Sequence, residues 1–357
     1  MNMESLINYI KEHMNVEAIE YDINYARITG SLNEPIQTTM REIDSFAKTT
    51  GYTVLYGRVH KSHVVRIGIV LQGSQNRKLW LHLLLFLATV FTTLWAGAQF
   101  EGGNPLVRFD DLWLGIPFSL SLMAILTGHE LGHYFVSRKM GMITSLPFFI
   151  PVPPLYLFSP GTFGAVIRTR SIIPDRKSLL LVGLSGPLTG FLIALPITII
   201  GLSLSQVQPV PTSGPFLVLG DSLLFYLIGR IIHPGLAPGM DIYLNSVALA
   251  GWLGFLITGL NLLPIGQLDG GHVAYAVLFD RRKILYVPLA LIMLGCGLLL
   301  WPGWIFWAVL AFFMSRRDPL IKDALTPLTL REKLLALIPL VILILTFIPK
   351  PLSIGYR

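Results

Sequence analysis

The sequence is poor in charged residues and in cysteine. Charged side chains occupy 13% of its 357 positions, compared with about 25% in soluble domains. Hydrophobic residues occupy 53% of the chain, and the mean hydropathy is +0.64. These values disfavour an ordinary cytosolic enzyme, and they exclude a disordered chain, which needs low hydrophobicity and high charge. The single cysteine, Cys296, leaves no partner for an internal disulfide and excludes a cysteine-rich metal cluster.

The charge that is present is mainly basic and unevenly placed. The chain has 27 Lys and Arg against 20 Asp and Glu, a net charge of +7. The basic residues flank apolar segments, as expected at membrane boundaries, and this does not favour nucleic-acid binding. We therefore predict an integral, multi-pass membrane protein whose surroundings are the lipid bilayer, with no nucleic-acid partner.

Residues 1–78 differ in composition from the rest of the chain, because they hold eight of the 20 acidic residues. The start of the chain has an early Glu4 and no apolar run behind a basic patch, so it does not resemble a signal peptide. Hydrophobic spacing predicts helices over Met3–His13 and Pro35–Thr49, a strand over Ala18–Ile28 and a hairpin over Tyr52–Leu71. We predict a small cytosolic α+β module, for which regulation, substrate docking and simple anchoring all stay open.

Residues 79–357 consist largely of apolar segments. A helix needs about 20 such residues to cross the hydrocarbon core of a bilayer. The candidate segments are Leu79–Ala98, Leu112–Val136, Leu179–Leu204, Ile242–Leu263, Ile284–Trp301, Trp304–Met314 and Leu334–Ile348. With some of these segments re-entrant, we predict a polytopic α-helical membrane protein with about six to eight membrane segments.

Basic pairs mark alternate ends of these apolar segments. Arg77–Lys78, Arg138–Lys139 and Arg176–Lys177 fall on one side of the membrane, whereas the loops on the other side are acidic or nearly neutral. The distribution predicts that the N-terminus and the basic loops are cytoplasmic. It also requires that Phe216–Ile232 does not cross the membrane fully.

Two histidines and a glutamate lie within the second apolar segment. His129 and His133 are four residues apart, so they project from the same face of a helix, with Glu130 between them. This spacing suits two imidazole nitrogens that bind one zinc ion, with a glutamate beside the metal-bound water. Unpaired ionisable groups in a membrane helix cost on the order of several kcal/mol. The motif therefore predicts a metal site, with a polar packing cluster as the alternative.

A catalytic zinc site usually has three protein ligands and one water. Asp269 is the leading candidate for the third ligand, because it follows Pro264 and glycines that interrupt an apolar segment. Broken helices at membrane depth are tolerated where they line a polar cavity. His272 and His82 are weaker candidates. Asp269 could also act as the N-cap of a short helix over Gly270–Phe279.

These motifs resemble those of the site-2 protease family of intramembrane zinc metalloproteases. The matching segments are HELGH at His129–His133 and NLLPIGQLDG at Asn261–Gly270, with further similarity at Gly161–Ile167 and Ser185–Gly190. The segment between the second and third apolar spans is too short for a PDZ domain. The chain is therefore more similar to the branch shared by plant plastids and prokaryotes.

The resemblance implies one Zn²⁺ per chain, bound by His129, His133 and Asp269, with Glu130 as the catalytic glutamate. It implies that Asn261 binds the substrate backbone or polarises the substrate carbonyl. The expected reaction is hydrolysis of a peptide bond within or near the transmembrane segment of a membrane-protein substrate. The resemblance covers about residues 112–280, which we expect to form the catalytic core. His133 lies only five residues before Arg138, so we expect the active site in the bilayer toward the cytoplasmic side.

The segment Thr144–Ile173 is apolar but rich in proline. Its first half cannot form a regular helix, and Thr162–Arg170 has the pattern of a strand. A free strand edge here could bind an unwound substrate by strand addition. We therefore assign substrate binding to a short group of residues, Gly161, Thr162, Phe163, Gly164 and Val166. A loop that dips into the membrane and plugs the cavity is the alternative.

Other functions remain possible on the sequence alone. A transporter or ion pathway would also place histidine and aspartate at broken helices, but it predicts two related halves, and we find no internal repeat. A protease that trims prenylated C-termini would use a distant glutamate as third ligand, and Glu332 lies in a basic loop. An inert scaffold would not need Glu130. The natural substrate and the oligomeric state stay open.

Overall fold

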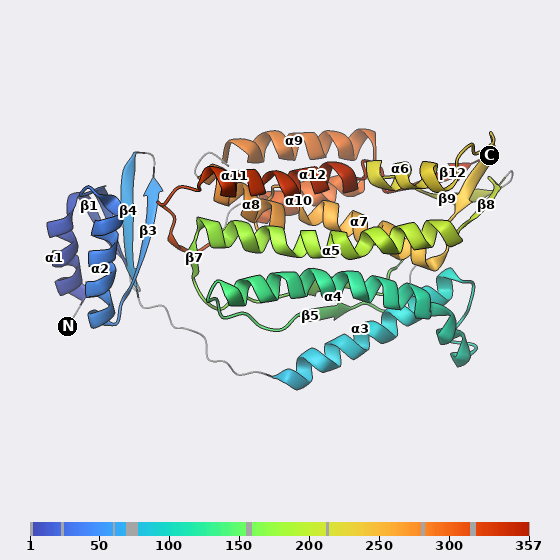
Figure 1. The fold of residues 1–357 in the computed structure, drawn as a ribbon, viewed down its shortest axis with the longest axis horizontal. Coiled ribbons are helices and arrows are strands. Elements are labelled where there is room, and N and C mark those ends of the chain that lie inside the picture. Colours follow the sequence, from blue (N-terminus) through green and yellow to red (C-terminus); the bar gives the residue numbers. More distant parts are fainter. Residues whose placement is uncertain are drawn as a thin grey trace.

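The computed structural model describes residues 3–22, 25–59, 61–68, 78–154, 159–211, 214–279, 283–314 and 319–356. A small α+β module and a larger helical bundle follow one another along the long axis of the molecule (Figure 1). Most helices of the bundle run along this axis. The N-terminal module lies at one end of the bundle, and the strands β8, β9 and β12 lie at the other end.

The N-terminal module packs two helices on one face of an antiparallel sheet. Its elements in chain order are α1 (Met3–His13), β1 (Met14–Tyr21), β2 (Tyr25–Leu32), α2 (Ile36–Thr50), β3 (Thr53–Val59) and β4 (Ser62–Gly68). Alternate residues of the strands, such as Ala26 and Ile28, are buried in one cluster with Leu6, Ile10 and Ile43 of the helices. This period of two is what a half-buried sheet requires.

The predicted helices and the predicted hairpin in this module are confirmed. The single strand predicted over Ala18–Ile28 is wrong, because this segment holds the end of β1 and the start of β2. The two strands pair antiparallel, with Tyr21 opposite Ala26. The Asp22 backbone amide donates to the Tyr25 carbonyl across the turn, at 2.9 Å.

The sheet of the module continues into the helical bundle. Strand β11 (Ile321–Asp323) pairs in parallel with β3, and β7 (Ile173–Asp175) pairs in parallel with β11. The strand order is therefore β1-β2-β4-β3-β11-β7. The two added strands come from distant parts of the chain, and the sequence did not predict this connection.

Among the residues that the structure describes, three helical segments are long and apolar enough to cross a membrane. They are α3 (Leu79–Phe100), the 3₁₀ helix η1 (Phe109–Gly115) with α4 (Ile116–Lys139), and α5 (Arg176–Leu204). The remaining helices are shorter: α6 (Leu223–Ile232), α7 (Ser246–Asn261), α8 (Asp269–Leu278), α9 (Lys283–Leu299), α10 (Gly303–Met314), α11 (Leu330–Leu335) and α12 (Leu337–Thr346). The described part of the chain is thus a helical bundle with three helices long enough to span a membrane and several shorter apolar ones.

The segment Phe216–Ile232 does not form a membrane-length helix. It contains most of β9 (Pro215–Leu219) and the 10-residue helix α6. A helix of this length spans about 15 Å, half of the hydrocarbon core. Strand β9 pairs with β12 (Leu352–Tyr356), and β8 (Gln206–Pro209) pairs with β10 (Met240–Tyr243).

Helices α4, α5 and α7 form the centre of the bundle because small residues let their backbones approach closely. A Cβ atom on Gly132 of α4 would lie 2.2 Å from Thr189 Oγ1 of α5. A Cβ atom on Gly251 of α7 would lie 2.4 Å from Thr198 Oγ1, also on α5. Small residues at such contacts are typical of membrane helices, which associate through close packing.

Candidate metal centre

His129 and His133 lie on consecutive turns of α4, and both side chains are buried. Their four-residue separation places them on one face of the helix, as the sequence predicted. The two Nε2 atoms are 3.2 Å apart. Two lone-pair nitrogens at this distance are expected where a cation lies between them.

Asp269, the first residue of α8, completes a group of three ligands. Its Oδ2 lies 3.2 Å from His129 Nε2, and its Oδ1 lies 3.2 Å from His133 Nε2. A tetrahedral zinc ion with bonds of about 2.0–2.1 Å holds its ligands about 3.3 Å apart. The three separations, and the chemistry of two imidazoles with one carboxylate, therefore fit a zinc ion with an open fourth position.

The break between α7 and α8 brings Asp269 to the histidines. Glycines allow the start of α8 to pack against this break, because a Cβ on Gly270 would lie 2.0 Å from the Leu262 carbonyl oxygen. The N-cap of α8 is Leu268, and no side chain caps this helix. The alternative role of Asp269 as an N-cap is therefore wrong, and its carboxylate lies at the two histidines instead.

The two weaker candidate ligands lie outside the group of three. His272 is one turn further along α8, and its Nδ1 is buried without a hydrogen-bond partner among the described residues. His82 of α3 places its Nδ1 3.0 Å from the Pro147 carbonyl oxygen and packs its ring on Phe148 at 4.1 Å. His82 thus contacts the loop that leads into β5.

Helix α5 holds the ring of His133 in place. His133 Nδ1 donates to the Val182 carbonyl oxygen at 2.8 Å, which leaves the lone pair on Nε2 for a metal. Helix α5 comes this close because position 186 is glycine. A Cβ there would lie 2.1 Å from His133 Nε2, and a Cβ on Gly190 would lie 3.2 Å from His129 Cβ. The sequence linked this helix to the metal site only through the similarity at Ser185–Gly190.

Glu130 is buried beside the group of three. Its carboxylate accepts a hydrogen bond from the backbone amide of Ile167 and lies close enough to His133 and Asp269 for direct charge interaction. Ile167 directly follows strand β6 (Thr162–Val166). The hairpin of β5 (Phe148–Pro151) and β6 therefore touches the candidate general base, a contact that sequence reasoning missed.

The five hairpin residues assigned to substrate binding have different surroundings. Gly161 packs against α3, where Thr92 Oγ1 donates to its carbonyl oxygen at 2.6 Å, and its φ of +79° suits glycine. Thr162 is buried and its hydroxyl donates to the Ile150 carbonyl oxygen. Gly164 is also buried, although a Cβ atom on it would meet nothing within 4 Å. Phe163 and Val166 are 79% and 52% exposed, so they present the side chains that are free for contact.

Strand β6 is shorter than the predicted strand Thr162–Arg170, because pairing with β5 ends at Val166. Residues 155–158 of the same predicted loop lie outside the described residues. Beyond β6 an isolated bridge joins Thr144 to Thr169. The proline-rich first half of the loop forms β5, in agreement with the prediction that it could not be helical.

Asn261 is the last residue of α7. The contact between Gly270 and the Leu262 carbonyl places the end of α7 next to the start of α8, and therefore near Asp269. Within the described part of the chain the Asn261 side chain makes no hydrogen bond. Its amide is thus available for another partner near the metal ligands.

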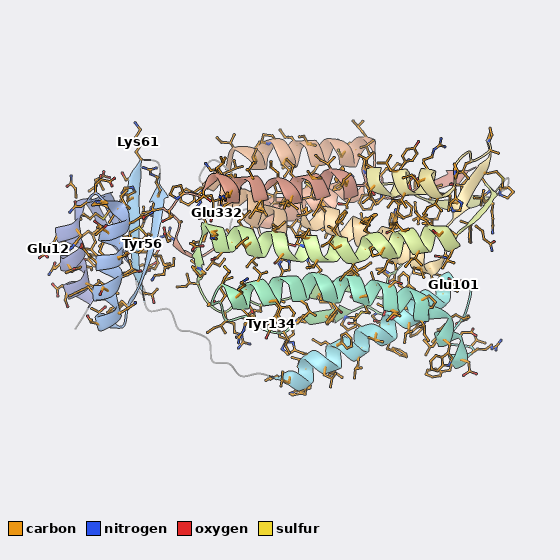
Figure 2. All side chains as sticks on the ribbon, viewed as in Figure 1. Glu12, Tyr56, Lys61, Glu101, Tyr134 and Glu332 are labelled. Atoms are coloured by element: carbon orange, nitrogen blue, oxygen red, sulfur yellow. The ribbon has the colours of Figure 1, made fainter. Side chains whose placement is uncertain are left out.

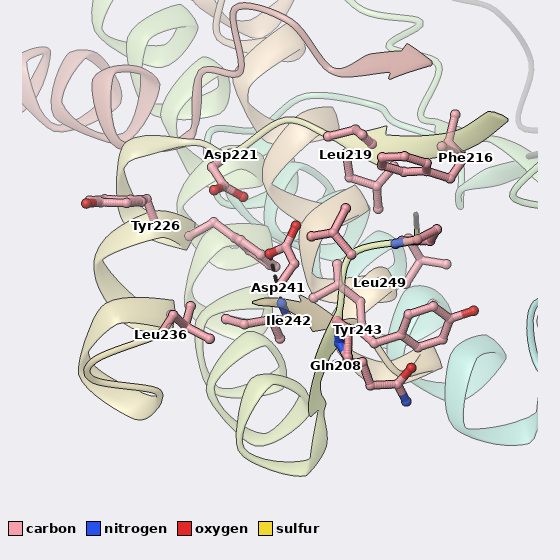
Figure 3. Close-up of a pocket in the computed structure, with 18 of the residues that line it drawn as sticks. Gln208, Phe216, Leu219, Asp221, Tyr226, Leu236, Asp241, Ile242, Tyr243 and Leu249 are labelled. Carbon is pink, nitrogen blue, oxygen red and sulfur yellow. Dashed lines mark hydrogen bonds between the residues drawn. The ribbon is translucent and has the colours of Figure 1, made fainter. Parts of the chain in front are cut away.

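A separate cavity of about 530 Å³ lies at the end of the bundle remote from the N-terminal module (Figures 1 and 3). Asp221, Asp241 and Tyr243 are among its lining residues. Burial and the neighbouring Asp241 carboxylate raise the pKa of Asp221 to about 6. None of the three candidate metal ligands lines this cavity.

The fold and the site together define a class of protein: a membrane-type helical bundle with a buried two-histidine, one-carboxylate centre beside a glutamate. A family model described as peptidase family M50 matches residues 117–300, slightly more than half of the chain. The chain belongs to this family, the site-2 protease family of zinc metalloproteases, and the predicted resemblance is confirmed.

The chain is similar to several plant proteins that are named probable zinc metalloproteases. The chain is 32% identical over 253 residues to probable zinc metalloprotease EGY2, chloroplastic, of Arabidopsis thaliana, which covers 68% of this chain and 44% of the relative. It is 31% identical over 250 residues to the EGY2 protein of Oryza sativa subsp. indica, and 29% identical over 241 residues to EGY1 of Arabidopsis thaliana. The shared regions cover 67% and 66% of this chain and 44% and 43% of those two relatives.

The chain thus spans less than half the length of these curated relatives. No solved structure matches the chain.

Proposed function

We propose that this protein is an intramembrane zinc metalloprotease that hydrolyses a peptide bond within or near the transmembrane segment of a membrane-protein substrate. The observation that carries the proposal is the geometry of His129, His133 and Asp269, whose ligand atoms lie 3.2 Å apart beside the buried Glu130. The family of the chain and the names of its relatives support the same function and the same metal.

Each residue of the site has a part in this reaction. When bound, zinc supplies Lewis-acid chemistry that makes water a nucleophile near neutral pH. Glu130 takes the proton of the attacking water and later returns it to the leaving amine. The Ile167 amide keeps the carboxylate of Glu130 in place for both steps. Asn261 donates a hydrogen bond to the substrate carbonyl, where negative charge develops.

The hairpin β5–β6 offers a way to hold the substrate. Peptide bonds in a helix are shielded by their own hydrogen bonds, so the cleaved segment must be extended and paired with another strand. The exposure of Phe163 and Val166 supports docking at β6, next to the base that β6 helps to hold. Gly161, Thr162 and Gly164 shape this strand, and Asn261 approaches the substrate from α7.

The arrangement of the chain in the membrane is part of the proposal. The membrane domain is residues 79–357, with the catalytic core at about residues 112–280, and residues 1–78 are the cytosolic module. The shorter apolar helices complete about six to eight membrane segments together with α3, α4 and α5. The N-terminus and the basic loops face the cytoplasm, and the active site lies toward that side. A transporter function is not supported, because the family is a peptidase family.

Substitution of the general base tests the proposal most directly. In the purified full chain, Glu130→Gln should retain zinc, because Glu130 is not one of the three ligands, but should lower cleavage by about 100-fold or more. The measurements are metal analysis and cleavage of a substrate with one membrane span. Glu12→Gln on the surface of the module should change neither quantity.

Asp269→Ala provides the complementary result, since loss of one of three ligands should lower both zinc content and cleavage. The proposed function is wrong if the wild-type protein binds no zinc, or if Glu130→Gln cleaves the substrate at the wild-type rate.

A further inference from the structure

Strand β11 lies between the N-terminal module and the helices that carry the metal site. It is the only strand of the described sheet that pairs with the module on one side and with the bundle on the other, through β3 and β7. The three residues of β11 come from the region after α10, far from both neighbours in sequence. The contacts of β11 on each side determine whether a displacement of the module can reach the helices that carry the metal site.

The module binds the segment around β11 through a few contacts of different kinds. The Ala324 backbone amide donates to the Tyr56 carbonyl oxygen at 3.1 Å. Lys322 Nζ lies 2.6 Å from Asp44 Oδ2 of α2, and the Tyr56 hydroxyl donates to Asp44 Oδ1 at 3.1 Å. Leu325 packs against the hydrophobic core of the module.

The bundle binds the same segment through a hydrophobic cluster. Ile321 and Ala324 are buried together with residues of two helices, Leu179 and Leu180 of α5 and Val273, Tyr275 and Ala276 of α8. The Ile173 backbone amide of β7 donates to the Leu320 carbonyl oxygen at 3.0 Å. The segment around β11 therefore packs against both helices that flank the metal centre.

Each of these two helices either carries or contacts a metal ligand. Strand β7 leads directly into α5, whose first turn is capped by Asp175 Oδ1, which accepts from the Ser178 amide at 2.7 Å. Two turns along α5 is the Val182 carbonyl oxygen, the partner of His133 Nδ1. Helix α8 begins with Asp269 itself, and Arg176 Nε ties it to α5 by donating to the Ala276 carbonyl oxygen at 2.9 Å.

We propose that the N-terminal module positions the metal ligands His133 and Asp269 through β11, an inference that rests on the proposed function. Asp44, Lys322 and Ala324 are positioning residues, because they act on the ligands only through α5 and α8. The contacts between the module and β11 are few and partly exposed, so a modest change at the module shifts the strand. The module is then a working part of the metal site and not a passive anchor.

Variants at the contact between β11 and the module test this inference in the full chain. Ala324→Pro removes the amide that donates to Tyr56, and it should speed the release of zinc to a chelator and lower kcat, each by about tenfold. Lys322→Ala and Asp44→Ala break a partly exposed ion pair and should each give a change of about two- to fivefold. The KM for the substrate should stay near the wild-type value, because these residues do not touch substrate.

Three comparisons separate positioning from general destabilisation. Lys322→Arg should keep wild-type values, and the Lys322→Ala/Asp44→Ala double variant should lose no more than the Asp44→Ala single variant, which already removes the shared ion pair and the contact with Tyr56. Glu20 lies on β1, at the far edge of the sheet, and Glu20→Gln breaks its exposed ion pair with Arg27 of β2, so this variant should change neither zinc release nor kcat.

The inference is overturned if the β11 variants lower only the unfolding temperature, with zinc release and kcat unchanged, or if only KM changes. This outcome differs from failure of the proposed function, in which the wild-type protein itself neither binds zinc nor depends on Glu130.

Discussion

Individual glycines decide whether the metal ligands can meet. Gly186 lets α5 pass directly beside the imidazole of His133, at a distance that leaves no room for a Cβ. Because the same ring is fixed by the Val182 carbonyl, it cannot turn away from an added methyl group without losing this hydrogen bond. Gly186 is therefore as necessary for the metal site as a ligand, although it binds nothing itself.

A single methyl group at position 186 should therefore weaken metal binding. Gly186→Ala should lower zinc affinity by about 10- to 100-fold, the range seen when the surroundings of a ligand are disturbed. Zinc competition with a chelator measures this effect. The matched control is Gly295→Ala in α9, where a Cβ meets nothing within 4 Å, and wild-type zinc affinity is expected there. Equal affinities in the two variants would contradict the packing argument.

Asp221 should make the stability of the protein depend on pH. Its pKa in the folded protein is raised from 3.8 to about 6, so between these values the folded state binds a proton that the unfolded state does not. The free energy of unfolding should therefore fall as the pH rises from about 4 to 6. Asp221→Asn should remove this component, which thermal unfolding at several pH values can measure. An unchanged pH profile in the variant would show that Asp221 titrates normally.

At the level of elements, the hairpin β5–β6 packs against two helices of the bundle. Strand β5 packs on α3 and β6 packs on α4. Strand β6 ends at Val166, and the amide of the next residue, Ile167, binds Glu130. A substrate strand added to this hairpin would therefore run past the general base. The side chains of Phe163 and Val166 are the exposed positions from which this arrangement can be probed.

Cysteine cross-linking should locate the bound substrate. In a Cys296→Ser, Glu130→Gln background, Phe163→Cys and Val166→Cys should form disulfides with a substrate that carries one cysteine near the cleaved bond, because β6 lies alongside it. Gel mobility under non-reducing conditions detects the product. Leu192→Cys on α5, which is 55% exposed in the wild type, is the control and should give none. Equal cross-linking at all three positions would argue against docking at β6.

On the scale of the whole molecule, charged residues lie at both ends of the long axis. Lys61 of the module and Glu332 lie toward one end of the long axis, and Glu101 lies at the other end (Figure 2). The three membrane-length helices run between these ends (Figure 1). A bilayer perpendicular to the long axis would therefore place the N-terminal module and the strands β8, β9 and β12 on opposite sides.

The proposed orientation can be measured on intact cells. In a Cys296→Ser background, Asp110→Cys should react with a membrane-impermeant maleimide, because η1 lies at the end opposite the module. Lys61→Cys in the module should react only after permeabilisation, as the distribution of basic residues predicts. Both positions are exposed in the structure. The reverse labelling pattern would place the N-terminus outside.

The sequence determined the features that depend on local spacing. The two histidines share a helix face because they are four residues apart, and the membrane character of the bundle follows from long apolar runs with basic flanks. The helices of the module were predicted from the spacing of their hydrophobic residues alone. The prediction of a single strand over Ala18–Ile28 failed because the alternation runs from β1 into β2 without a break, so the pattern does not reveal where the chain reverses.

Only the tertiary structure decided how distant segments meet. The contact of Gly186 with His133, the hydrogen bond from Ile167 to Glu130 and the insertion of β11 between β3 and β7 each join residues that are far apart in sequence. No local pattern encodes such contacts, since they depend on how whole helices pack against each other. The sequence thus specified the chemical groups of the site, and packing specified their geometry.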